Sequence, residues 1–193
     1  MTRKPQILFT LILSLMIILG CPGQQEQETV IEQESRMLII YYSLTGNTEY
    51  IAEQIQAITD AEIFKIELVE PYDIEYESVI SRARSEREEG KLPELSKSIE
   101  NLSEYDVIFL GTPNWFGTLS LPMISFLETH KITDQILIPF ITHGRGGVQN
   151  TVSDLLKMCG NATFLQEFGV FGSEVHESLN EIEDWLERIG MRP

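Results

Sequence analysis

The segment over residues 37–48, MLIIYYSLTGNT, constrains the fold of this chain more than any other. It opens with the uncharged run 38–42, whose β-branched and aromatic residues predict a central strand that is covered on both faces. A polar loop over residues 43–48 follows, and the next residues carry apolar side chains at helical spacing. A strand, a short polar loop and a helix in succession present backbone N–H groups and a helix dipole to an anion.

The side chains of this loop limit which anion it can hold. It carries the hydroxyls of Ser43, Thr45 and Thr48, the amide of Asn47 and the glycine Gly46, and it contains no lysine or arginine. A nucleoside-triphosphate loop needs a lysine and a longer glycine-rich stretch, and the dinucleotide fingerprint needs three glycines, so both are excluded. Two interpretations remain, a neutral cradle for one terminal phosphate monoester and an ordinary strand-to-helix turn with a polar cap.

Length and composition bound the remaining possibilities. The 193 residues suffice for one domain with attachments. The formal net charge of −16 argues against a nucleic-acid partner, because phosphate backbones are bound by lysine and arginine. The two cysteines, Cys21 and Cys159, allow at most one disulfide, and no Cys/His cluster has the spacing of metal ligands. We therefore predict no metal site, and we expect Cys159 to be a buried thiol.

The N-terminal segment is typical of an export signal rather than of a folded domain. Arg3 and Lys4 precede an apolar run over residues 7–19, which is shorter than the roughly 20 residues that a membrane-spanning helix needs. The segment 1–21 ends in Leu-Gly-Cys21 and resembles the lipobox of prokaryotic lipoproteins, which implies lipidation of Cys21. The alternative is an uncleaved signal anchor. In both cases we expect an exported domain, anchored on the outer face of a prokaryotic cytoplasmic membrane.

Residues 22–36 are rich in glutamine and glutamate and have few apolar side chains to bury, so we expect a flexible tether. The globular domain then occupies residues 37–193. Apolar segments and amphipathic segments alternate along it, which predicts a doubly wound parallel sheet with helices on both faces and right-handed crossovers. Besides the first strand, we predict strands over residues 62–68, 107–110, 136–141 and 163–170. Helical patterns include residues 76–89, 148–158 and 174–189. Residues 91–104 are assigned no role.

The loops after the first, third and fourth predicted strands are unusual in composition. All three fall on the carboxyl edge of the sheet, where ligands of such sheets bind. The second of them, over residues 111–118, places Trp115 and Phe116 beside two glycines and a proline. Two large aromatic side chains in a loop are either core anchors or a stacking platform for a flat ring.

The third loop, over residues 142–147, is rich in glycine. Gly144, Gly146 and Gly147 offer backbone N–H groups with little obstruction, which suits hydrogen bonding to the polar edge of a planar heterocycle. His143 is either a hydrogen-bond donor at that edge or a structural residue. Arg145 is either a solvent-facing side chain or a contact for the ligand or a partner.

One phosphate, one flat ring system and one polar edge together describe FMN. The motifs SLTGNT, GTPNWFGT with LPMISFLE, and THGRGG resemble the three FMN-binding loops of the flavodoxin family, in this order and at comparable spacing. The third motif is often THGGSG, so Arg145 and Gly146 stand where the family has Gly and Ser. The resemblance covers residues 37 to about 190 and is closest to a branch whose members include exported lipoproteins.

This resemblance implies an α/β fold of the flavodoxin-like doubly wound type, with a five-stranded parallel sheet in the order 2-1-3-4-5 known for flavodoxin itself. It also implies which residues hold FMN. The phosphate is assigned to Ser43, Thr45, Gly46, Asn47 and Thr48. The ring is assigned to Pro113, Asn114, Trp115, Phe116 and Gly117, and its polar edge to Thr142, His143, Gly144 and Gly146.

Three functions fit these features. The first is a membrane-tethered FMN electron carrier of low potential, because the negative charge disfavours an anionic reduced flavin and steers the protein toward basic partner proteins. The second is an FMN-dependent NAD(P)H/quinone-type oxidoreductase on the same fold. The third is a non-redox lipoprotein that binds another phosphorylated ligand. No nucleophile–base pair is apparent, since Ser43 has no histidine near it in sequence. The redox partner and the oligomeric state are not predicted.

Overall fold

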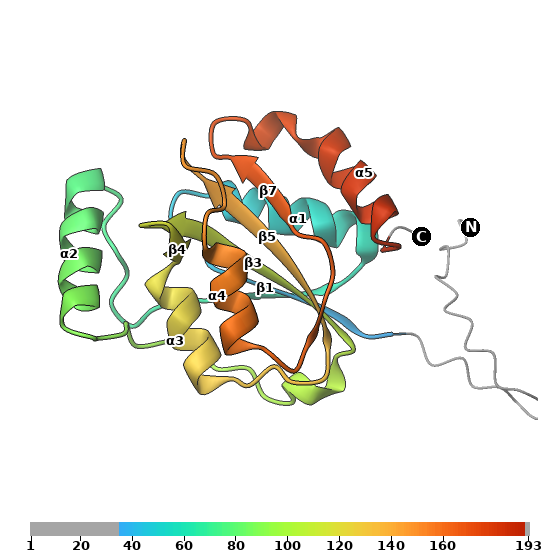
Figure 1. The fold of residues 1–193 in the computed structure, drawn as a ribbon, viewed down its shortest axis with the longest axis horizontal. Helices are drawn as coiled ribbons and strands as arrows, with labels where there is room; N and C mark the ends of the chain where they lie inside the picture. The colour runs from blue at the N-terminus through green and yellow to red at the C-terminus, as the bar shows by residue number, and fades with distance from the viewer. Residues whose placement is uncertain (1–34, 192–193) are drawn as a thin grey trace, which may run out of the picture.

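Strands and helices alternate along residues 35–191, which are the residues that the computed structural model describes (Figure 1). The strands are β1 (Met37–Tyr41), β2 (Glu62–Lys65), β3 (Val107–Trp115), β4 (Thr118–Leu119), β5 (Ile136–His143), β6 (Thr163–Phe164) and β7 (Phe168–Phe171). The helices are α1 (Asn47–Thr59), α2 (Tyr76–Glu88), α3 (Leu121–Thr129), α4 (Thr151–Met158) and α5 (Leu179–Arg188), with 3-10 turns η1 (Leu102–Glu104) and η2 (Val175–Glu177). The predicted signal with Cys21, and nearly all of the predicted tether, lie outside the described residues.

The sheet has the predicted parallel core. Its order is β2-β1-β3-β5, and β6 and β7 both pair with β5, so the order 2-1-3-4-5 is confirmed when β6 and β7 together count as the fifth strand. The sheet has seven strands rather than the predicted five. The fifth strand is interrupted at residues 165–167. Before the interruption β6 pairs with the start of β5, and after it β7 pairs with the end of β5. The seventh strand, β4, is antiparallel to the end of β3.

Helices cover both faces of the sheet, as predicted. Successive residues of a strand point to opposite faces, so Ile39 and Ile40 of β1 enter two separate hydrophobic clusters. The first cluster joins Ile39 to α1 and α5 and contains the fully buried Trp185. The second joins Ile40 to α3 and α4 and contains the fully buried Phe126. Figure 1 shows α1 with α5 on one side of the sheet and α3 with α4 on the other.

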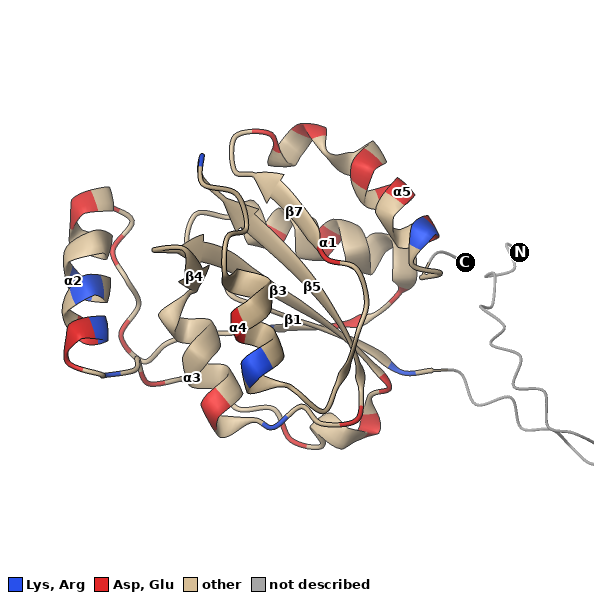
Figure 2. Cartoon of the chain, viewed as in Figure 1, with Lys and Arg blue, Asp and Glu red and all other residues tan. Residues whose placement is uncertain are grey.

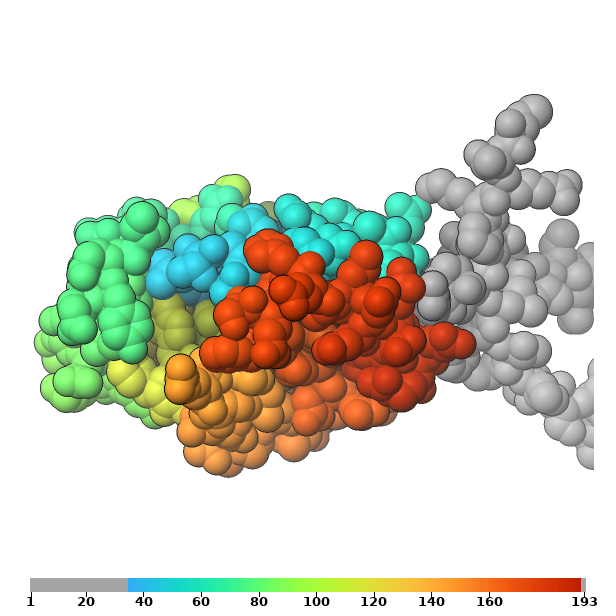
Figure 3. All heavy atoms as spheres, turned by 90° about the horizontal axis from the view of Figure 1, so that it is seen from above, coloured from blue at the N-terminus to red at the C-terminus, as the bar shows by residue number. Residues whose placement is uncertain are grey.

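Helix α2 lies beyond the carboxyl ends of the strands rather than on a face of the sheet (Figures 1 and 3). Its side chains Val79 and Ala83 are buried against the domain. The Arg82 guanidinium lies 4.2 Å from the centroid of the Tyr72 ring, and the Tyr72 hydroxyl donates a hydrogen bond to Glu86. The helix is therefore held at one end of the domain, next to the loops that follow β1 and β3.

Strand β3 is longer than predicted. The segment 111–118 reads as a loop in the sequence, but β3 continues to Trp115, because it pairs with β5 as far as Pro113 and its last two residues pair with β4. Phe116 and Gly117 then form a tight turn into β4, with φ angles of 54° and 84°. Positive φ at both central residues is typical of a type I′ hairpin turn. This region is thus a rigid hairpin rather than a loose loop.

The remaining boundaries differ modestly from the prediction. Strand β2 ends at Lys65, α4 begins at Thr151, and the last predicted helix consists of η2 followed by α5. The unassigned segment 91–104 carries one isolated bridge, between Leu68 and Leu95, and the turn η1. Across residues 35–191, no helix is long and apolar enough to cross a membrane.

Candidate functional site

The loops after β1, β3 and β5 meet at the carboxyl edge of the sheet, because these three parallel strands are neighbours. Two cavities of about 450 and 680 Å³ lie there. They share Asn114, Phe116 and Gly144, so they form one groove. Of the predicted site residues, all except Gly46 line this groove: Ser43, Thr45, Asn47, Thr48, Pro113, Asn114, Trp115, Phe116, Gly117, Thr142, His143, Gly144 and Gly146.

One end of the groove has the features of an anion cradle. Gly46 has a φ of 90° and turns the chain from β1 into α1, whose first N–H groups have no partner within the helix. The hydroxyl oxygen of Ser43 is buried, lines the groove and has no hydrogen-bond partner among the described residues. Burying a hydroxyl without a hydrogen-bond partner costs free energy. An anion that accepts a hydrogen bond from this hydroxyl removes the cost.

Thr48 contributes to this end differently from the prediction. Its side chain is almost fully buried, and its hydroxyl lies 2.8 Å from that of Thr142. The hydroxyl thus links the first turn of α1 to the end of β5. Among the three predicted hydroxyls, the buried one without a hydrogen-bond partner in the described part of the chain is that of Ser43.

The other end of the groove is organised by the side-chain amide of Asn114. The side-chain nitrogen of Asn114 donates to the carbonyl oxygens of Gly147 and Val148, at 3.0 Å each. Its side-chain oxygen accepts from the backbone N–H of Gly117, also at 3.0 Å. The amide therefore locks the β3–β4 turn to the loop after β5, and both walls of this end are held in fixed positions.

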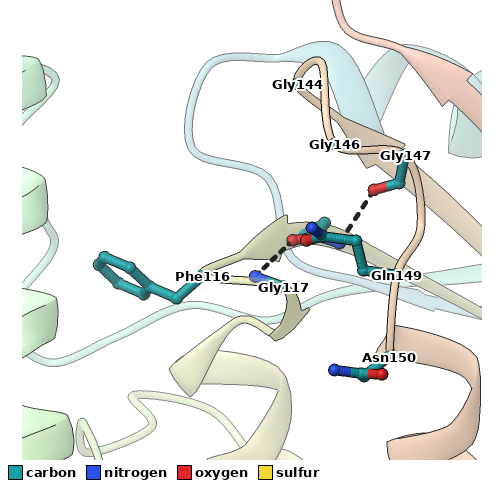
Figure 4. Close-up of a pocket in the computed structure, with 8 residues that line it drawn as sticks. Phe116, Gly117, Gly144, Gly146, Gly147, Gln149 and Asn150 are labelled. Carbon is teal, nitrogen blue, oxygen red and sulfur yellow. Dashed lines mark hydrogen bonds between the residues drawn. The ribbon is translucent and has the colours of Figure 1, made fainter.

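The two aromatic residues that the sequence pairs have different environments. Trp115 makes edge-to-face contacts with Tyr42 and Tyr72, with ring centroids 5.8 and 5.0 Å away, and packs against the hydrophobic core. Phe116 is 48% exposed and projects from the hairpin turn toward α2 (Figure 4). Trp115 is thus a core anchor that also lines the groove, whereas Phe116 is available to a ligand.

Sequence reasoning missed the wall that α2 and the residues just before it contribute. Ile74, Tyr76 and Ile80 line the groove opposite the loops, and Ile74 and Tyr76 are 81% and 72% exposed. The sequence predicts a helix over residues 76–89, but its pattern does not say what the helix faces. Sequence reasoning also missed Gln149 and Phe171, because neither lies in a recognisable motif.

The groove is electrically neutral. None of its described lining residues is an aspartate, glutamate, lysine or arginine. Figure 2 shows acidic positions along α2 and α5, whereas the ends of β3 and β4 are uncharged. Arg145, the only basic residue of the loop after β5, is exposed and does not line either cavity. Burial raises the pKa of the Tyr42 phenol, so it stays neutral.

The other titratable groups offer no further chemistry here. The His143 ring nitrogen Nδ1 lies 2.7 Å from its neighbour's carbonyl oxygen, on Gly144, and donates to it. Cys159 is a buried free thiol, as predicted, and burial raises its pKa to about 11. Within residues 35–191, no group of three or more His, Cys, Asp or Glu side chains is arranged to hold a metal ion.

A family model described as "Flavodoxin" matches residues 36–189 of this chain. The chain belongs to the flavodoxin family. The match covers all three groove loops and every described helix and strand, so the resemblance of the three motifs is confirmed at the level of the family.

Solved structures agree with this assignment. A Bacteroides eggerthii protein assigned as a flavoprotein is 26% identical, with a TM-score of 0.68 over 80% of this flavodoxin-family chain and 98% of its own. A flavoprotein from Lactobacillus acidophilus, solved in complex with FMN, is 25% identical, with a TM-score of 0.61 over 74% of this chain and 97% of its own.

One curated relative carries the name of an enzyme. A protein named NAD(P)H dehydrogenase (quinone) from Cupriavidus metallidurans is 30% identical over 94 residues. The match covers 49% of this flavodoxin-family chain and 46% of the relative, so the chain spans about half the length of the protein that carries the name.

Proposed function

We propose that the groove binds FMN and that this flavodoxin-family chain is a redox protein. The observation that carries the proposal is the buried, unpartnered hydroxyl of Ser43 at one end of a groove whose other end is lined by glycine. The solved neighbour in complex with FMN supports the same ligand. Ser43, Thr45 and the first N–H groups of α1 would hold the phosphate through neutral donors.

The remaining groove residues would fix the position of the ring. Asn114 holds the β3–β4 turn and the loop after β5 at a constant separation, so a flat ring meets a preformed slot. Trp115 forms a rigid apolar wall, and Phe116 partly shields the opening. When bound, FMN supplies the electron transfer itself, and the chain supplies position and electrostatic field.

We favour a low-potential electron carrier. The formal charge of −16 opposes added negative charge on the ligand, which lowers its reduction potential below that of free FMN. Among the described residues that line the groove, none is a lysine or arginine that would offset this effect. An acidic surface also steers transient encounters toward basic partner proteins.

An FMN-dependent NAD(P)H/quinone-type oxidoreductase is the second candidate. The Cupriavidus relative supports it. The exposed apolar side chains of Ile74, Tyr76 and Phe116 at the groove opening also support it, because they would contact a flat apolar second substrate. Steady-state assays with NAD(P)H and a quinone test this candidate directly, and turnover would favour the enzyme over the carrier.

We further propose that the N-terminal segment holds the domain at the outer face of a cytoplasmic membrane, through a lipid on Cys21 or through an uncleaved anchor. Metabolic labelling with a fatty acid distinguishes the two forms. Label that is lost in Cys21→Ser supports lipidation. Membrane association that persists without label supports the anchor, and release of the protein into the soluble fraction contradicts both.

Absorbance spectroscopy tests the central proposal. The purified protein is mixed with FMN, freed of unbound ligand and compared with Ser43→Ala. We expect the wild type to retain flavin with shifted absorbance bands. We expect Ser43→Ala to bind FMN about tenfold more weakly, because the variant loses one hydrogen bond to a charged group. Folded protein without flavin would contradict the proposal and favour a lipoprotein that binds another phosphorylated ligand. Reduction of the bound flavin in two stages rather than one identifies a one-electron carrier.

A further inference from the structure

We propose that the side-chain amide of Gln149 binds the pyrimidine edge of the flavin and contributes to the preference for this ring. This inference rests on the proposed function, because it assigns a residue to the same groove. Gln149 lies between the loop after β5 and the start of α4, and it lines the glycine-rich end of the groove. No motif in the sequence marks it.

The backbone of Gln149 is held in an unfavourable conformation. Its φ is 44°, in the left-handed region that residues other than glycine rarely adopt. Backbone hydrogen bonds fix the chain on the following side, from Asn150 to the carbonyl of Gly117 at 3.0 Å and from Thr151 to that of Val148 at 3.0 Å. Such conformations persist where the surrounding structure imposes them, and they concentrate at ligand-binding positions.

The amide of Gln149 lies between the two walls of the groove. A Cβ atom added at Gly117 would be 2.9 Å from its side-chain oxygen, and one added at Gly146 would be 3.0 Å from its side-chain nitrogen. A side chain at either glycine would therefore displace this amide from its position between the two walls. Figure 4 shows the side chain reaching from the segment before α4 toward Gly117.

The hydrogen-bonding capacity of this amide is unused. Among the described residues, none forms a hydrogen bond with the Gln149 side chain, and Figure 4 draws none. The neighbouring amide of Asn114, by contrast, is engaged by Gly117, Gly147 and Val148. The exposed Gln149 side chain therefore presents an NH2 donor group and a carbonyl acceptor, neither of them paired with a described protein group, in an otherwise neutral, glycine-lined cavity.

The pyrimidine edge of a flavin has the complementary pattern, an N3–H donor flanked by two carbonyl acceptors. Carboxamides read the donor and acceptor edges of nucleobases by the same two-point pairing. The phosphate cradle at Ser43 lies at the far end of the groove, so a ligand held there by its phosphate extends its ring toward Gln149. The amide is thus matched in chemistry and in location to the edge that identifies the ring.

A double comparison of protein and ligand tests the inference. FMN and 3-methyl-FMN, in which the N3 hydrogen is replaced, are titrated by fluorescence into wild type, Gln149→Ala, Gln149→Asn and the exposed control Gln166→Ala. We expect wild type and the control to prefer FMN by at least about tenfold, the value of one hydrogen bond. We expect both Gln149 variants to bind FMN about tenfold more weakly and to lose most of that preference. Asparagine accepts the left-handed backbone, so Gln149→Asn keeps the fold while its shorter amide falls short of the ring.

The possible outcomes separate three conclusions. If wild type does not bind FMN, the proposed function fails. If wild type binds FMN and the Gln149 variants retain the full preference for FMN over 3-methyl-FMN, the proposed function stands and this inference is overturned. If the variants lose equal affinity for both ligands, Gln149 only supports the shape of the groove, and the inference is overturned as well.

Discussion

The side-chain hydroxyls of Thr48 and Thr142 lie 2.8 Å apart in the interior of the protein. Thr48 belongs to the first turn of α1, and Thr142 is the penultimate residue of β5. One hydrogen bond thus fixes the helix that follows the proposed phosphate cradle against the strand that leads into the proposed ring-edge loop. The two residues are 94 positions apart, and each lies in a different predicted loop motif.

Replacing one member of this pair is expected to destabilise the FMN-free protein. Thr142→Val keeps the shape and leaves the Thr48 hydroxyl buried without a partner, which costs about 1–3 kcal/mol. The double variant Thr48→Val/Thr142→Val removes both polar groups, so its cost is expected to be smaller than the sum of the single costs. Urea unfolding measures all three, with the exposed Thr163→Val as control. Strictly additive costs would contradict the coupling.

Much of the fold follows from local sequence. The uncharged run before Ser43 predicts β1, and the alternation of strands and helices predicts a parallel sheet with a ligand edge. The extension of β3 does not follow, because Gly111 and Pro113 favour a loop locally and the segment becomes a strand only through pairing with β5 and β4. The position of α2 beyond the sheet edge also depends on tertiary contacts, chiefly those of Tyr72.

The lining of the groove was predictable where the type of side chain suggests a ligand contact, as at Ser43 and Asn47. The role of a residue was less predictable where it depends on three-dimensional geometry. Asn114 was expected beside the ring, but the sequence gives no sign that its amide joins two segments of the chain. Gln149 has no local signal at all, because its place depends on a positive φ and on glycines from two other segments.

Asn114→Ala is expected to weaken FMN binding more than any change at the surface. It removes three hydrogen bonds that hold the β3–β4 turn against the loop after β5, so the slot widens and the protein loses about 1–3 kcal/mol of stability. We expect FMN affinity to fall at least about tenfold, since a preformed site loses affinity when it must be ordered. Fluorescence titration measures the affinity, with the exposed Asn161→Ala as control. Unchanged affinity would show that the clamp is not needed.

Gly111 is required by a close contact rather than by backbone conformation. A Cβ atom there would lie 2.1 Å from the tip of the Phe140 ring, which is fully buried. Gly111→Ala is therefore expected to cost about 1–3 kcal/mol or more, because the ring has no space into which it can move. Gly144→Ala provides the matched control, since nothing lies within 4 Å of its added Cβ. Thermal and urea unfolding compare the two, and equal stabilities would refute the steric argument.

Acid is expected to destabilise the fold through two carboxylates that link separate elements. Hydrogen bonds from Lys157 and Thr118 hold the pKa of Asp154 below its ordinary value, and those from Lys65 and Tyr41 hold that of Glu49 low despite partial desolvation. Because each pKa is lower in the folded state, the unfolded state binds more protons as the pH falls, and stability present at neutral pH is lost in acid.

The loss should begin as the pH falls to about 5 and continue through the ordinary values of 4.5 for Glu49 and 3.8 for Asp154 toward their lower folded-state values. We expect the double variant Glu49→Gln/Asp154→Asn to be less stable than wild type at neutral pH. Below about pH 5 its free energy of unfolding should depend less steeply on pH. The exposed control Glu128→Gln should follow wild type. Urea unfolding from about pH 3 to pH 7 measures the dependence. An unchanged slope in the double variant would mean that other groups cause the acid sensitivity, and that the Thr118–Asp154 contact between β4 and α4 contributes little.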